Sequence, residues 1–196
     1  MEGSNQEGIF RSAHEAVVFA LNFASQQYAL SPIAKLMQGG ALGSGRGLSG
    51  LDGAAQAGMV IAELAKLDYY HAVSLVARCA TRQIRCSCSS PCCSGWRDSE
   101  LWREAISIMT DHAIAALAGE LSNREVRLAS VQKHFGHKVT IQEIADDAGV
   151  HRETAGKQHA KIVGALKGLE SRAWQAFSSA LESGGMLIRE ENSESA

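Results

Sequence analysis

Three short segments of this chain carry the signature of a helix start, and they constrain its fold more than any other feature. Ser12 to Glu15, Ser122 to Glu125 and Thr140 to Glu143 each place a hydroxyl side chain three residues before a glutamate. In such a capping box the hydroxyl accepts a hydrogen bond from an early backbone N–H, and the glutamate reaches back to the cap residue. We therefore expect helices to begin at about residues 13, 123 and 141.

The spacing of apolar residues predicts further helices along the rest of the chain. Alanine occupies 30 of 196 positions and only 6% of the residues are aromatic, which favours packed helices over a strand-rich sandwich. No segment shows a convincing strand pattern, so we predict an all-α fold. One expected helix ends at Gly136, and a shorter one begins at about residue 141. Elsewhere apolar residues recur every three or four positions, which predicts helices over about 13–28, 52–66, 68–81, 99–118, 151–167 and 169–183.

Residues 139–162 carry the strongest single pattern, which we interpret as a helix-turn-helix. Two helices that cross steeply need a small residue at the contact, here Ala145, and a turn residue that tolerates positive φ, here Gly149. The side chains expected on the inner side are Ile144, Ala148, Val150, Ala155 and Ile162.

The second helix of this pair leaves a polar row outside. Arginine and glutamine can contact base edges with two hydrogen bonds, and lysine suits phosphates. The alternative is an ordinary helical hairpin with a solvated charged face. The candidate DNA-binding residues are Arg152, Glu153, Thr154, Lys157, Gln158 and Lys161.

Charge is distributed unevenly along the chain, whose net charge is −2. Residues 122–172 contain nine Lys or Arg against six acids, together with four of the seven histidines. A second basic segment, Arg78 to Arg97, holds four arginines and no acid. This segregation suits a polyanionic partner, although solvated surfaces also produce it.

Four cysteines fall within eight residues, at Cys86, Cys88, Cys92 and Cys93. Zinc accepts four thiolates in a tetrahedron, and the surrounding Ser, Pro and Gly allow tight turns, so we predict a zinc site in a loop over 84–95. Cys79 or His112 could replace one ligand. Reduced cysteines in a packed loop, or a redox switch, are the alternatives.

Other function classes find little support in the sequence. No apolar stretch approaches the roughly 18 residues of a membrane span, and acids at the N-terminus make export unlikely, so we expect a cytoplasmic protein without a membrane partner. No Ser/His/Asp series or paired carboxylates show an interpretable catalytic spacing. We therefore expect no enzymatic activity.

The cysteine-rich loop with Cys93-Ser-Gly-Trp96, the long helix after it and the C-terminal helix pair together resemble Q-type transcription antitermination factors of phage origin, or a related bacterial regulator of lysis genes. The resemblance covers about residues 45–175. It implies a protein that binds a promoter DNA element, engages RNA polymerase paused with its σ factor, and allows read-through of terminators. Nascent RNA is a further partner it suggests.

The implied organisation has four parts. An N-terminal helix and glycine-rich loop occupy 1–50, and a helical region containing the cysteine loop occupies 51–121. A helix-turn-helix DNA-binding region follows over 122–183, and 184–196 are expected to be a disordered tail. A simple helix-turn-helix repressor or activator is the alternative function, and a zinc-dependent interaction module without DNA affinity is the third. The oligomeric state is left open.

Overall fold

The computed structural model of the chain describes residues 8–27, 33, 51–88, 90, 94–118 and 123–188. Most of these residues are helical, which confirms the predicted helical character. The helices are α1 (Ala13–Gln27), α3 (Leu51–Ala65), α4 (Tyr69–Cys79), α5 (Glu100–His112) with the 3-10 turn η1 (Ala113–Leu117), α6 (Arg124–His134), α7 (Ile141–Asp147) and α8 (Arg152–Ser183). The described residues also include two short strands, β1 (Gln83–Arg85) and β2 (Trp96–Asp98).

Two of the three predicted helices begin where the sequence indicates, but only the Thr140–Glu143 capping box is complete, because the Glu15 carboxylate accepts from the Arg11 N–H and not from that of Ser12. The Ser12 Oγ accepts from the Glu15 N–H at 3.1 Å, and the Thr140 Oγ1 accepts from the Glu143 N–H at 3.2 Å. At α6 the cap is instead Asn123, whose Oδ1 accepts from the N–H groups of the second and third residues after it. Residue 122 lies outside the described ranges. Asparagine is as good a cap as serine, so the helix begins one residue later.

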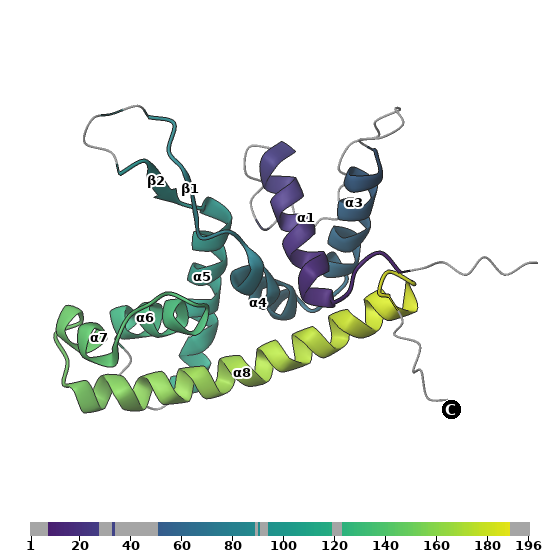
Figure 1. The fold of residues 1–196 in the computed structure, drawn as a ribbon. Helices are drawn as coiled ribbons and strands as arrows, with labels where there is room; N and C mark the ends of the chain where they lie inside the picture. Colours follow the sequence, from purple (N-terminus) through teal and green to yellow (C-terminus); the bar gives the residue numbers. More distant parts are fainter. Residues whose placement is uncertain are drawn as a thin grey trace, which may run out of the picture.

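The prediction of two helices over 151–167 and 169–183 is wrong, because α8 is one continuous helix of 32 residues. At about 1.5 Å per residue it is roughly 48 Å long. Figure 1 shows α6 and α7 beside its N-terminal end and α1 and α3 toward its C-terminal end. Its buried side chains recur every three or four residues through Gly164 and Gly168, at Ile162, Leu166, Leu169, Ala173, Phe177 and Leu181.

The buried apolar side chains form two clusters of unequal size. The larger cluster draws on α1, α3, α4, α5, α6 and α8. The smaller consists of Val126, Ile144, Ala145 and Ala155, from α6, α7 and the start of α8. Residues 184–188, which the sequence assigned to the tail, pair with the N-terminal segment, since the Phe10 N–H donates to the Met186 carbonyl at 3.0 Å. None of the described helices is long and apolar enough to cross a membrane.

The stretch predicted as a loop over 84–95 begins and ends in two antiparallel strands, which pair as a hairpin. Gln83 pairs with Asp98, Ile84 with Arg97 and Arg85 with Trp96. Beyond the strands, the Cys86 N–H donates to the Gly95 carbonyl at 2.9 Å, where Gly95 has φ +80°. Strands of three residues are too short to show the alternation of apolar and polar residues, so the sequence did not predict them.

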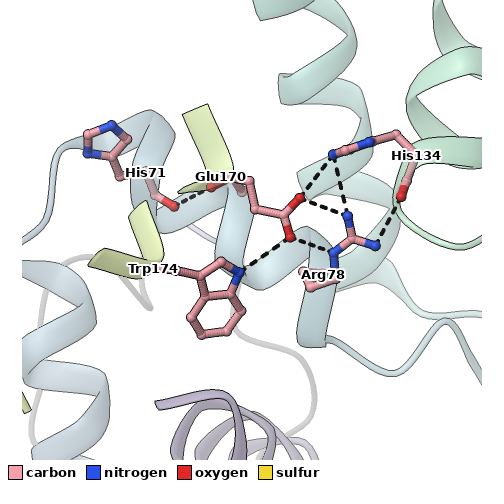
Figure 2. Close-up of polar contacts among 6 residues, drawn as sticks. His71, Arg78, His134, Glu170 and Trp174 are labelled. Carbon is pink, nitrogen blue, oxygen red and sulfur yellow. Dashed lines mark hydrogen bonds and ion pairs between the residues drawn. The ribbon is translucent and has the colours of Figure 1, made fainter. Parts of the chain in front are cut away.

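Arg78 of α4 joins two other helices through a half-buried cluster (Figure 2). Its Nε and Nη2 donate to the two carboxylate oxygens of Glu170 at 2.6 and 2.7 Å, and its Nη1 donates to the His134 carbonyl at 3.0 Å. The His134 Nε2 lies 3.0 Å from Glu170 Oε2. Burial alone would raise the pKa of Glu170, but hydrogen bonds from Arg78 and His134 outweigh it and hold this pKa at about 2. The cluster fixes α6 and α8 against α4.

Candidate nucleic-acid interface

The turn between α7 and α8 is tight and fully hydrogen-bonded to α7. The Gly149 N–H donates to the Asp146 carbonyl at 3.2 Å, and the Val150 N–H donates to the Ala145 carbonyl at 3.0 Å. Gly149 has φ +61°, a left-handed conformation that side chains other than glycine rarely adopt. The residue predicted to tolerate positive φ in this turn therefore does so.

The inner side of the helix pair is also as predicted. Ile144 and Ala145 of α7 and Ala155 of α8 are buried together, with Ala148 and Val150 packed partly against them. Ile162 is buried in the larger core. The same packing fixes the two helices against α6.

Asn123 adds a contact that the sequence did not identify. Its Nδ2 donates to the Ala148 carbonyl at 3.3 Å and joins the start of α6 to the turn. The only sequence signal for it was the preference of asparagine for helix starts.

Five of the six candidate DNA-binding side chains lie on the outside of α8, namely Arg152, Glu153, Thr154, Lys157 and Lys161, all of which are exposed. We call these five the outward row. The prediction that Gln158 also faces outward is wrong, since this residue is only 5% exposed. Gln158 lies three residues after Ala155 and four before Ile162, which places it on the inner stripe of the helix.

Within the outward row, Lys157 and Glu153 form an exposed ion pair. Their Nζ and Oε1 atoms are 2.8 Å apart, and both side chains are about 70% exposed, at 71% and 69%. A pair so open to solvent contributes at most about 1 kcal/mol. Lys157 can therefore exchange the carboxylate for a phosphate at little cost.

The first turns of α7 and α8 are held by local caps. The Thr140 N–H donates to Glu143 Oε2 at 2.6 Å, and hydrogen bonds from the backbone and side chain of Thr140 lower the pKa of Glu143. His151 caps α8, its Nδ1 accepting from the Glu153 N–H at 3.4 Å. A Cβ on Gly156 would meet Ile141 at 3.8 Å, an ordinary contact, so helix packing does not require this glycine. The start of α8 is thus well defined.

The cysteine segment follows β1. Cys86 is half-buried and Cys88 exposed, whereas Cys92 and Cys93 lie outside the described residues. Cys79 is packed in the larger core, and burial raises the pKa of its thiol to about 12, so it stays protonated. His112 ends α5, about 18 Å along the helix from the hairpin, with its ring centroid 4.2 Å from that of Tyr70. Neither residue suits the role of a replacement ligand.

No protein-family model, curated protein or solved structure matches this chain. The geometry of α6, α7 and α8 and the charges that they present are therefore the basis for a function.

Proposed function

We propose that this chain binds double-stranded DNA through a helix-turn-helix formed by α7 and α8. The observation that carries the proposal is the outward row of exposed side chains at the start of α8. The turn before it contains Gly149 with positive φ, and the inner side of α8 is buried against α7. In helix-turn-helix proteins the second helix enters the major groove with its N-terminal residues against base edges, while the first crosses the backbone. The outward row supports this docking because Arg152, Glu153 and Thr154 lie in the first turn of α8.

The chemistry of the row divides between reading bases and holding phosphates. Arg152, in the first turn of α8, can donate two hydrogen bonds to a guanine edge. Lys157 and Lys161 follow five and nine residues later on the exposed side, where an ammonium group meets phosphate oxygens. Glu153 and Thr154 supply an acceptor and a hydroxyl for further base contacts.

The kind of regulation that we propose is transcription antitermination. Its support is the resemblance to Q-type factors, which combine a cysteine-rich segment, a helix after it and a C-terminal DNA-binding helix pair. The rest of the protein, built on the larger core, would then contact RNA polymerase and its σ factor, and nascent RNA where it emerges. A simple repressor or activator is the second candidate, because the outward row alone suffices for it.

We expect the purified chain to raise read-through at a terminator placed well downstream, and only on templates that carry its promoter element. The physical reason is that the outward row must hold the protein beside the paused polymerase. The measurement is the read-through fraction in a reconstituted reaction with purified polymerase and σ factor. The same element is scrambled as a control, and duplex binding is recorded in parallel. Reduced initiation with an unchanged terminated fraction would instead identify a repressor.

The cysteine segment fits the predicted zinc site in one respect. The Cys86 N–H donates to the Gly95 carbonyl, so the segment whose sequence carries the four cysteines has its two ends held together. Four thiols in such a loop form a donor set that zinc prefers. Bound zinc would supply a tetrahedral cross-link that stabilises the loop and the start of α5.

We expect one zinc per chain, bound by Cys86, Cys88, Cys92 and Cys93. Metal analysis of reduced protein purified without added zinc measures it, with Cys79→Ser as the matched control because Cys79 lies in the core. Cys88→Ser should remove most of the metal. Stoichiometry below about 0.2 in fresh wild-type protein would leave the packed-cysteine interpretation in place.

A further inference from the structure

The β1–β2 hairpin presents two matched pairs of side chains on one face. Side chains alternate between the faces of a strand, so the pair Gln83 and Asp98 shares a face with the pair Arg85 and Trp96, about 7 Å further along. The intervening pair, Ile84 and Arg97, points to the other face. Trp96, Gln83 and Asp98 therefore lie on one continuous face of the hairpin.

Trp96 is an unusual residue to find open to solvent. Trp96 is 51% exposed, and the guanidinium carbon of Arg85 lies over its ring, 5.3 Å from the ring centroid. Every residue of β2 is exposed. Exposed aromatic rings are platforms on which single-stranded bases stack, and arginine adds a cation–π attraction; each stacked base contributes affinity largely without regard to sequence.

At the base of the hairpin the same face borders a cavity of about 460 Å³. Among the lining residues that the structure describes, the cationic and titratable ones are Arg82, His137 and Lys138, and Asp98 is the single acid. Trp102 also lines it, and the indole N–H of this buried residue has no hydrogen-bond partner among the described residues. The size lies within the range of ligand sites, and the charge balance favours an anionic ligand that also offers hydrogen-bonding groups.

The parts of this surface are rigidly joined. The Arg82 Nη1 donates to the Gly136 carbonyl at 2.5 Å and ties β1 to the segment that carries His137 and Lys138. The Ser99 N–H donates to the Arg82 carbonyl at 2.7 Å and fixes the start of α5. Figure 1 shows the hairpin at the opposite end of α5 from α8. The surface is therefore separate from the outward row.

We propose that this hairpin face and cavity bind single-stranded nucleic acid, with a base stacked on Trp96 and backbone phosphates held by Arg82 and Lys138. The arrangement combines the two elements of such sites, a cationic groove and an aromatic platform. The cations Arg82 and Lys138 at the cavity favour a polyanion over a protein partner. The proposal does not depend on duplex binding by α8.

The test is the affinity of the full chain for fluorescently labelled oligothymidylate and oligouridylate of about 12 nucleotides, measured by anisotropy at low salt. Trp96→Ala should weaken binding roughly tenfold or more, and Trp96→Phe should retain most of it. Arg85→Ala should also weaken it. The matched control is Tyr69→Ala, which removes another exposed aromatic, 45% exposed, from α4. Because Trp96, Arg85 and Tyr69 are all exposed, these variants should keep the wild-type melting temperature.

Two results would overturn the proposal: no binding of single strands by the wild-type chain, or equal affinity for Trp96→Ala and Tyr69→Ala. Duplex binding in the same variants separates this site from α8, because Trp96→Ala should leave duplex affinity unchanged. A chain that binds single strands but no duplex would refute only the helix-turn-helix proposal.

Discussion

Replacing Arg78 by alanine should lower the free energy of unfolding by about 3 kcal/mol. The variant leaves the Glu170 carboxylate, only 12% exposed, without the two hydrogen bonds that now hold it at 2.6 and 2.7 Å. Breaking a buried ion pair costs about 3 to 5 kcal/mol, and the lower end applies because the Arg78 side chain is itself 27% exposed. Urea unfolding followed by circular dichroism measures the change.

The matched control is Lys66→Ala, which breaks an ion pair of the same 2.6 Å length at the surface. Its lysine is 67% exposed, so the cost should stay below about 1 kcal/mol. Equal losses in the two variants would show that the Arg78 cluster contributes no more than a surface pair.

The same cluster makes the stability of the wild-type chain sensitive to acid. Because the pKa of Glu170 is lowered to about 2 in the folded state, its ionised form stabilises the fold fully above the ordinary carboxyl range. This contribution is lost as the pH falls from about 4.5 toward 2. The Arg78→Ala variant should lose much of that pH dependence, which urea titrations across this window would detect.

The second large effect is expected at Arg152, where alanine should reduce discrimination between the preferred duplex and a scrambled one by about 1 to 3 kcal/mol. The guanidinium group at the exposed start of α8 can donate two parallel hydrogen bonds to guanine, and alanine removes both. The measured quantity is the ratio of the two Kd values. Lys161→Ala should instead weaken both duplexes alike and lower the salt slope by about one.

Arg172→Ala is the matched control for charge, because Arg172 is an exposed arginine on the same helix and lies twenty residues beyond Arg152. It should change neither the ratio nor the slope appreciably. If Arg172→Ala and Arg152→Ala weaken binding equally, α8 attracts DNA through its total charge and does not read bases.

Local signals predicted the helices well. The hydroxyl and glutamate of Thr140 and Glu143 can form a cap whatever the rest of the chain does, and both of their hydrogen bonds are present. Gly149 likewise follows from a conformation that other residues resist. These features depend on interactions between residues close in sequence, so the sequence alone shows them.

The features that were missed depend on distant partners. The continuity of α8 through Gly168 follows from a row of buried side chains packed on several helices, which outweighs the roughly 1 kcal/mol cost of a glycine. The hairpin needs pairing across the cysteine segment, as between Gln83 and Asp98. The Arg78 cluster joins residues up to 92 positions apart. The periodicity of apolar residues in the sequence gives no signal for contacts between such distant residues.

DNA recognition by α8 is tested most directly by selecting duplexes from a randomised pool with the full chain and measuring anisotropy of the selected and scrambled sequences across a range of salt. We expect an enriched sequence whose advantage falls with Arg152→Ala and persists with Arg172→Ala. Lys157→Ala and Lys161→Ala should each reduce the salt slope by about one. Failure to enrich any sequence, with outward-row and control variants binding alike, would contradict DNA recognition by α8.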